Sequence, residues 1–316
     1  MSETATSAAF GGRPSMSFEP VFNGMDYLGS AVDDLTAHQP PTARDLKYAV
    51  LHLQAAVEVL LKARLVREHW SLVFKDPGAA TRARFDKGDF VSCDSAAVMD
   101  RLSNIVGLTL DDDDRQSLRT LTKTRNALTH WGHTAPAHAV EGNAVGVLHF
   151  LLSFIDGHLA PSLSADAQVV ELKLGPVRAK LSQIERLVKL RMDSLRADLE
   201  PVSDRTVACP GCDQWALVVG GTPVVCRFCT RRFDSPLEMA QEYAWVTRRS
   251  HEYIVMESCS SCLTDRTLVV ARTAQAKDTT VALCFACGVQ YELSLNVRTP
   301  LGTPRQEVRR SEGELG

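Results

Sequence analysis

The chain has 316 residues, of which 45% are hydrophobic, and a net charge of −3. These values predict a globular protein of two or three domains and exclude a strongly basic nucleic-acid binder. The longest apolar run, residues 145–155, is shorter than the roughly 20 residues that a membrane span needs. Residues 1–14 lack the basic start and apolar run of a secretory signal, so we expect a cytoplasmic protein without a membrane partner.

Composition divides the chain into seven segments. Residues 1–17 and 299–316 are polar and rich in small, Gly/Pro or charged residues, which predicts disordered ends. Between them we expect a mainly α fold: a helical bundle, a connecting helix, and two small β modules joined by a linker helix. The predicted boundaries are 18–165 for the bundle, 166–200 for the connecting helix, 201–235 for the first β module, 236–254 for the linker helix and 255–298 for the second β module.

The bundle segment has the hydrophobic spacing of helices. Leu46, Val50, Leu53, Val57 and Leu60 recur every three or four residues, which predicts a helix that faces the core. Further helices are predicted over residues 95–105, from the acidic run 111–114 to Trp131, and over residues 139–159. Four such helices make a bundle of ordinary domain size.

Several polar residues in this segment are interpreted as structural. Asp111 to Asp114 are four consecutive residues that point to different sides of a helix, so they cannot all bind one metal ion. The start of a helix favours negative charge, and we interpret the run as that start. His52, His149, His158 and the isolated Cys93 are likewise expected to be structural.

The third predicted helix ends in Arg125, Asn126 and, five residues after the arginine, His130. A guanidinium can bind a phosphodiester and stabilise the charge that grows on it. An imidazole can accept or donate a proton near neutral pH. Five residues correspond to about 140° on a helix, so both side chains share a groove only if the last turn before Gly132 frays. The simpler alternative is an ion-paired Arg125, a surface Asn126 and a His130 that caps the helix.

Residues 125–130 resemble the R-N-x3-H motif of the HEPN family, all-helical domains that often cleave RNA. The helix with Glu58, three apolar residues and Lys62 is similar to the family's early helix, and the resemblance covers about residues 46–161. It implies a metal-independent, homodimeric endoribonuclease of toxin or antiviral defence. Its catalytic residues would be Arg125, Asn126, His130 and Glu58, with Glu58 paired to Arg125. The alternative is a catalytically silent bundle that binds a nucleotide or a partner.

The connecting helix is predicted over residues 174–199, with Gly175 and Pro176 at its start. Its apolar residues recur at heptad-like spacing: Val177, Leu181, Ile184, Val188 and Leu195. Two interpretations remain open. The residues form either a coiled-coil seam between two chains or the buried face of a helix that packs on its own bundle.

Eight of the nine cysteines form four C-x2-C pairs in the last third of the chain: Cys209/Cys212, Cys226/Cys229, Cys259/Cys262 and Cys284/Cys287. A two-residue spacer lets both sulfurs of a pair bind one ion, and neighbouring pairs complete a tetrahedron. The sequence therefore predicts two structural Zn²⁺ sites without an open coordination position. The alternatives are disulfides or a redox pair, which a reducing compartment disfavours.

Each predicted zinc site includes a β-hairpin. Residues 215–219 and 222–226 flank Gly220 and Gly221, and residues 267–273 and 279–284 form the second pair of strands. Between the sites, Ser235 is expected to cap a short helix.

Basic and aromatic residues alternate around the first site, in Arg227, Phe228, Arg231, Arg232 and Phe233. Such a pattern can bind phosphates and stack on bases, which suggests contact with RNA or DNA. A protein partner or a purely structural role are the alternatives.

Overall fold

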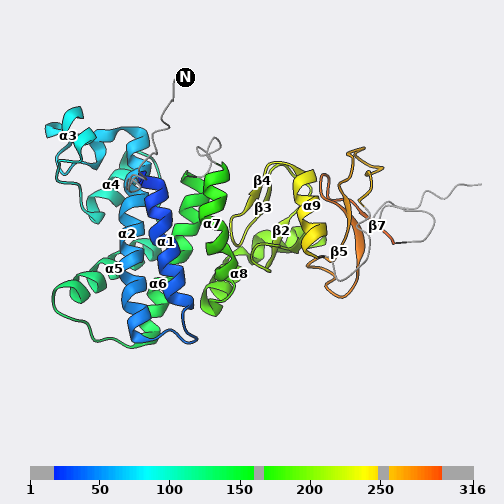
Figure 1. Ribbon diagram of the computed structural model, residues 1–316, viewed down its shortest axis with the longest axis horizontal. Coiled ribbons are helices and arrows are strands. Elements are labelled where there is room, and N and C mark those ends of the chain that lie inside the picture. Colours follow the sequence, from blue (N-terminus) through cyan, green and yellow to red (C-terminus); the bar gives the residue numbers. More distant parts are fainter. Residues whose placement is uncertain (1–17, 160–166, 248–255, 294–316) are drawn as a thin grey trace, which may run out of the picture.

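A computed structural model describes residues 18–159, 167–247 and 256–293. The two predicted disordered ends, 1–17 and 299–316, lie outside the described residues. The molecule is elongated, with helices at one end and strands at the other (Figure 1). The helical end contains α1 (Pro20–Thr36), α2 (Ala43–Glu68), α3 (Arg82–Lys87), α4 (Ser95–Asn104), α5 (Asp112–His130), α6 (Ala137–Phe154), α7 (Ala167–Leu181) and α8 (Glu185–Leu199). Short helical turns follow α2 at Trp70–Val73 and Pro77–Ala79, α6 at Ile155–Leu159, and α8 at Glu200–Arg205.

The other end holds two small antiparallel sheets. The first has the order β1-β2-β3-β4, with β1 (Thr206–Ala208), β2 (Trp215–Val218), β3 (Val224–Cys226) and β4 (Arg232–Phe233). The second has the order β5-β6-β7, with β5 (Leu268–Ala271), β6 (Val281–Cys284) and β7 (Gln290–Tyr291). α9 (Pro236–Val246) lies between them in the chain. The predicted mainly α fold with two small β modules and both hairpins is confirmed.

Local capping explains where three predicted helices begin. The Thr42 side chain accepts a hydrogen bond from the backbone of Asp45, whose carboxylate accepts one from the backbone of Thr42, a capping box that starts α2. Asp111 accepts a 2.7 Å hydrogen bond from the backbone of Asp114, so the acidic run does begin α5. Ser235 caps α9 in the same way.

α1 is a helix that was not predicted from the sequence. Met25, Leu28, Val32 and Leu35 form its buried face at the spacing of an amphipathic helix. It packs closely along α2, because Gly24 has no side chain: a Cβ there would lie 2.5 Å from Cγ of Leu60.

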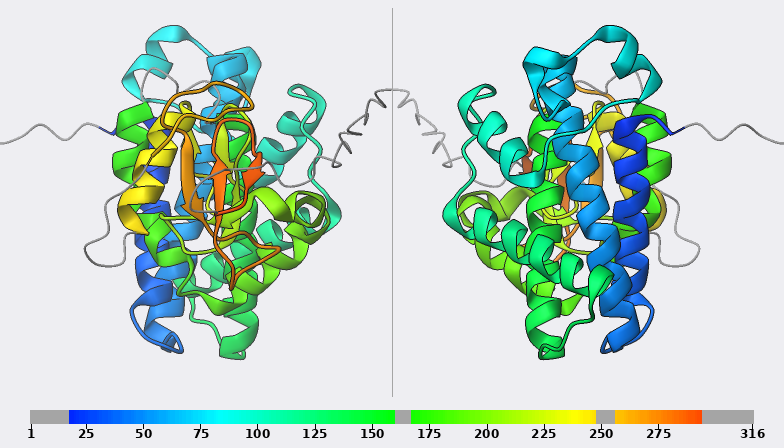
Figure 2. Two further views of the ribbon diagram at one scale, coloured as in Figure 1. Left: turned by 90° about the vertical axis from the view of Figure 1, so that its right-hand side faces the viewer. Right: turned by 90° about the vertical axis from the view of Figure 1, so that its left-hand side faces the viewer.

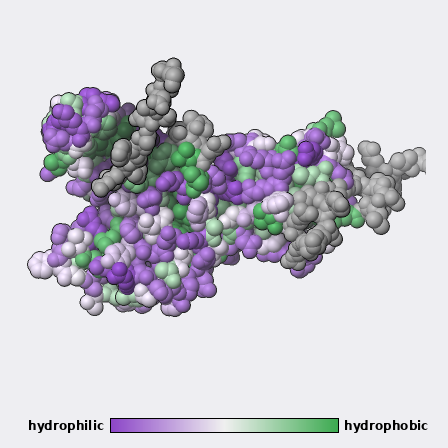
Figure 3. Space-filling view, in the orientation of Figure 1, coloured by the Kyte–Doolittle hydropathy of each residue, from purple (hydrophilic) through white to green (hydrophobic). Residues whose placement is uncertain are grey.

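α6 and the turn that follows it, Ala137–Leu159, form one helix long and apolar enough to cross a membrane by length and composition. Leu148 and Leu151 on this helix are fully buried inside the chain. α6 lies against α2, α5 and α8, so its hydrophobic residues are those of a core helix of the bundle. On the face of the molecule in Figure 3, hydrophobic residues lie in separate small patches.

The connecting segment is two helices rather than one. α7 ends where the amides of Gln183 and Ile184 bond to carbonyls three residues earlier, and α8 starts at Glu185. Pro176 lies inside α7 and does not start it. Side chains before and after the proline are buried on the same face of the helix. Val177, Leu181 and Ile184 are buried against the chain's own bundle. The coiled-coil interpretation is therefore wrong, and packing on the bundle is confirmed.

The β modules are joined to the bundle and to each other. One hydrophobic core runs from the bundle into the first sheet. The Gly220 amide donates a 3.2 Å hydrogen bond to the carbonyl of Phe285, and a Cβ on Gly220 would lie 2.9 Å from Gly288. Gly220 has a φ of 87°, so this close approach between the two modules requires glycine. Figure 2 shows the molecule from both ends, with the second module in front in the left view and the bundle in front in the right view.

Candidate functional site

Arg125 lies on the face of α5 that packs against α2. Its Nη2 atom donates a 3.4 Å hydrogen bond to Oε1 of Glu58, the pairing expected from the sequence. The Arg125 side chain is 30% exposed and that of Glu58 is 35% exposed. The pair is therefore open to solvent and to a bound ligand, and its contribution to the free energy of unfolding is small.

A buried amide supports this pair. Gln54, one turn before Glu58 and 2% exposed, accepts a 3.1 Å hydrogen bond from the Thr122 hydroxyl. Its Nε2 atom donates to Glu58 at 3.5 Å and to Ser95 at 3.4 Å. Gln54 was not among the site residues predicted from the sequence. The available signal was the four-residue spacing of Gln54, Glu58 and Lys62 along a helix that is otherwise largely apolar on its packed face.

Asn126 and His130 lie on another face of α5 and are exposed to solvent. Neither side chain has a hydrogen-bond partner among the described residues. The last turn of α5 does not fray, because Trp131 and Gly132 both donate backbone hydrogen bonds to the Ala127 carbonyl. Arg125 and His130 therefore stay about 140° apart on a regular helix. The expected shared groove within one chain is not formed.

The cysteines form two clusters, each made from two neighbouring pairs as predicted: Cys209, Cys212, Cys226 and Cys229, and Cys259, Cys262, Cys284 and Cys287. Within each cluster the four sulfurs lie within 4.8 Å of one another. The distances from Cys209 to Cys229 and from Cys212 to Cys226 are 3.8 and 3.7 Å, and the second cluster has the same two values. A tetrahedron with Zn–S bonds of about 2.3 Å has edges of about 3.8 Å. Both clusters can hold a metal ion, and all eight thiols are free of disulfides.

All four cysteine pairs adopt the same turn. In each pair, the residue after the second cysteine has a left-handed backbone conformation. Its amide donates a hydrogen bond of 2.8 or 2.9 Å to the carbonyl of the first cysteine. These residues are Asp213, Thr230, Leu263 and Gly288, with φ values of 59°, 60°, 59° and 77°. The turn points both sulfurs of a pair to one side, which is the local reason that a two-residue spacer suits a metal site.

Further groups surround the sulfurs. The Gly211 amide donates to Cys209 at 3.4 Å, and the hydroxyl of Tyr291, itself 1% exposed, lies 3.2 Å from Cys259. The hydrogen bond from Cys212 lowers the pKa of Cys209, and the bond to Cys209 raises the pKa of Cys212. The four sulfurs of a cluster thus compete for protons that a divalent cation would replace. With four protein ligands per cluster, no position is left for a substrate.

Two buried arginines attach the first cluster to the bundle. Arg178 of α7 donates a 3.1 Å hydrogen bond to the carbonyl of Cys229. Arg191 of α8 donates to the carbonyls of Phe228 at 2.8 Å and Arg227 at 3.1 Å. Both arginines are at most 5% exposed. The geometry of this cysteine pair is therefore tied to two bundle helices.

The aromatic residues of the first module do not form a stacking surface. Phe228 and Phe233 are buried, with exposed fractions of 0% and 5%. Arg231 is held by Glu242 and Glu171 at 2.5 to 3.0 Å. The interpretation of this segment as a base-stacking site is wrong, because the rings form the core that supports the cysteine turns.

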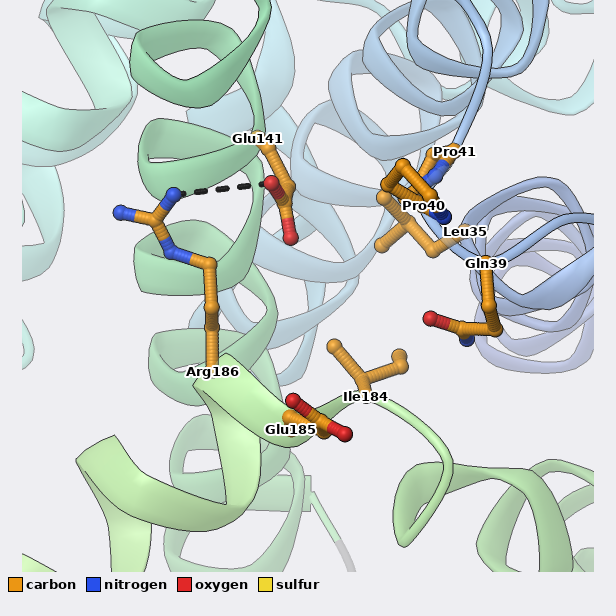
Figure 4. Close-up of a pocket in the computed structure, with 8 residues that line it drawn as sticks. All are labelled: Leu35, Gln39, Pro40, Pro41, Glu141, Ile184, Glu185 and Arg186. Carbon is orange, nitrogen blue, oxygen red and sulfur yellow. Dashed lines mark hydrogen bonds and ion pairs between the residues drawn. The ribbon is translucent and has the colours of Figure 1, made fainter.

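Two cavities lie elsewhere in the bundle. The first, about 350 Å³, lies between the α1–α2 connection, the start of α6 and the α7–α8 junction (Figure 4). There Arg186 binds Glu141 at 3.5 Å, while Glu185 and Gln39 also line the space. None of the HEPN-like motif residues lines this cavity.

The second cavity, about 390 Å³, lies between the start of α5 and α6 and is lined by Asp114, Ser117 and His149 among others. Burial raises the pKa of Asp114 to about 6, and neighbouring Asp111 adds to this shift. Burial, helped by Arg191, lowers the pKa of His149 to about 4. Both residues are expected from the sequence to be structural. In the structure, neither has the hydrogen-bond partners of a catalytic dyad among the described residues.

No family model, curated protein or solved structure matches this chain.

Proposed function

We propose that the protein is a metal-independent endoribonuclease of HEPN type. The observation that carries the proposal is the set Arg125, Asn126 and His130 at the end of one bundle helix, with Glu58 of the neighbouring helix bonded to the arginine. Solvent reaches all four side chains. Phosphodiester cleavage requires a cation that binds the phosphate and a group that transfers protons, and Arg125 and His130 are side chains of these two kinds.

In the proposed reaction, a base removes the proton of the ribose 2′-OH, and that oxygen attacks the adjacent phosphorus. The bond from phosphorus to the 5′-oxygen breaks, and an acid protonates the leaving oxygen. Arg125 stabilises the charge on the non-bridging oxygens, and Asn126 orients the phosphate. The products are a 2′,3′-cyclic phosphate and a 5′-hydroxyl.

The reaction needs an acid and a base, whereas each chain supplies one motif histidine. A two-fold homodimer brings two copies of His130 to one site. The separation of Arg125 and His130 on α5 supports the same arrangement, because a second chain can bring its own His130 to the phosphate that Arg125 binds.

The test compares wild type with His130→Ala and the control His133→Ala, which changes another exposed histidine three residues later. Because proton transfer is worth about 10²–10⁴-fold, we expect His130→Ala to lose cleavage by that factor and His133→Ala to retain it. Cleavage should persist in EDTA, with cyclic phosphate ends. Equal cleavage by His130→Ala, or 5′-phosphate ends, would contradict the assignment.

The second candidate is a catalytically silent bundle that binds a nucleotide or a partner. The observation in its favour is that Arg125 is engaged by Glu58 while His130 faces solvent on a different side of the helix. Unaltered growth on expression of wild type, together with nucleotide binding that Arg125→Ala abolishes, would favour this candidate.

The cysteine clusters are proposed to hold two structural Zn²⁺ ions. Their closed ligand sets support a role in folding the β modules, which we propose contact a target, trigger or protein partner. We further propose that the enzyme acts in the cytoplasm in toxin or antiviral defence. Growth arrest on expression of wild type and its absence with His130→Ala would support this role.

A further inference from the structure

The part of α5 after its acidic first turn, the loop that follows and the start of α6 carry an unbalanced positive charge. Residues 115–140 contain no Asp or Glu but four basic residues, Arg115, Arg119, Lys123 and Arg125, although the whole chain has a net charge of −3. Two of these cations have acidic partners: Arg115 lies 3.9 Å from Asp100 and Arg125 lies 3.4 Å from Glu58. The side chains of Arg119 and Lys123 have no ion pair or hydrogen bond within the described part of the chain.

The two unpaired cations lie in line with the motif. Gln116, Arg119, Lys123, Asn126 and His130 follow one another at spacings of three or four residues, so they share one face of α5, and all five are exposed. We call these five residues the α5 stripe. At 1.5 Å per residue it runs about 21 Å along the helix and ends at the proposed proton-transferring group.

An exposed aromatic ring stands at that end. Trp131, directly after His130, is 94% exposed, the largest exposed fraction among the exposed hydrophobic side chains of the described residues. Exposure of an indole ring to water is unfavourable, and stacking of a flat partner on the ring removes part of this cost. Nucleobases are such flat partners. α5 lies at the end of the molecule away from the strands, so the β modules of the same chain do not cover this surface (Figure 1).

We propose that the α5 stripe and Trp131 bind single-stranded RNA, with phosphates along Arg119 and Lys123 and an unpaired base on Trp131. This rests on the proposed function, because it delivers the scissile phosphate to His130. Complementarity between a row of unpaired cations and a phosphate backbone identifies the ligand class. The ring selects single strands, because a base offers its face for stacking only when it is not paired.

The experiment measures fluorescence anisotropy of a labelled 2′-O-methyl-uridine 12-mer with the full chain at several salt concentrations. The 2′-O-methyl group blocks cleavage, so binding is measured alone. Arg119→Gln/Lys123→Gln should weaken binding and reduce the slope of log affinity against log salt by about 1.4, at roughly 0.7 for each lost phosphate contact. Trp131→Ala should weaken binding at least about fivefold and leave that slope unchanged.

Lys87→Gln is the matched control, since Lys87 is an exposed lysine at the end of α3. Binding that all variants alter equally, a wild type that prefers the duplex form of the oligonucleotide, or no binding at all would overturn the inference. If the variants behave as expected but unmodified RNA is not cleaved, the proposed function fails and the RNA-binding surface stands. If RNA is cleaved with dependence on His130 but the stripe variants bind normally, only this inference fails.

Discussion

The Nε atom of Arg191 donates a 2.8 Å hydrogen bond to the carbonyl oxygen of Phe228, which lies between Cys226 and Cys229 in one of the cysteine turns. The same guanidinium reaches the His149 carbonyl at 3.2 Å and the Ser153 hydroxyl at 3.2 Å, both on α6. One buried cation thus joins a core helix of the bundle, α8 and the first cysteine cluster. The β module is part of the same packed body as the bundle rather than a separate unit.

Arg191→Ala should lower the free energy of unfolding by about 3 kcal/mol, because several buried carbonyls lose their donor at once. Urea unfolding followed by circular dichroism measures this change. The control is Arg196→Ala on the same helix, where the side chain is 73% exposed and the expected change is below about 0.5 kcal/mol. Equal changes for the two variants would mean that the buried contacts contribute nothing.

Two zinc ions per chain are expected in protein purified without chelator. Cys212→Ser should reduce this to one, because a structural site with three thiolates binds metal much more weakly. Cys93→Ser is the control and should keep two ions, since Cys93 is buried in the bundle outside both clusters. Elemental analysis and thiol titration measure both quantities, and a metal content near zero in wild type would refute the proposed metal sites.

Mixed dimers test whether Arg125 and His130 act across an interface. Arg125→Ala and His130→Ala should each be inactive alone, whereas mixing the two unfolded and refolded chains should restore part of the cleavage. Each heterodimer keeps one arginine and one histidine, which come together if the residues are shared across the interface. The second His130 is missing, so only part of the cleavage returns. A monomeric wild type that is fully active in sedimentation experiments would contradict the composite site.

Asp114→Asn should stabilise the protein above pH 6. Burial raises the pKa of Asp114 from 3.8 to about 6, so the folded state binds this proton more tightly than the unfolded chain. Its favourable contribution is complete below pH 3.8 and is lost as the pH rises through 6. The full shift corresponds to about 3 kcal/mol, which solvent screening of this half-exposed group reduces to about 1 kcal/mol.

The difference in unfolding free energy between Asp114→Asn and wild type, measured from pH 4 to 8, isolates this group. His149 acts in the opposite direction over the same range, because its lowered pKa of about 4 makes the folded state bind its proton less tightly. Its contribution cancels in the difference. Asp112→Asn, an exposed carboxylate in the same helical turn, is the control. A difference that does not change with pH would show that Asp114 titrates normally.

The sequence by itself determined the features that depend on neighbouring residues. The convergence of both sulfurs within each C-x2-C pair follows from its spacing, because each turn is closed by its own backbone hydrogen bonds. The starts of α5 and α9 likewise follow from Asp111 and Ser235, which cap amides three residues away. Helix spacing also predicted the bundle, since a buried face repeats every three to four residues. The catalytic roles of Arg125 and His130 stay predictions.

Only the tertiary structure decided the surroundings of side chains whose local sequence pattern allows more than one interpretation. The sequence suggests that Phe228, beside its arginines, stacks on bases. In the structure it is buried in the core of the sheet, and its carbonyl binds Arg191, which lies 37 residues earlier. Ile184 reads as a seam residue but packs on its own bundle, and Gln54 and Thr122 meet across 68 residues to support Glu58. Such contacts join residues far apart in the chain, so no local spacing encodes them. Packing of whole helices against one another selects them.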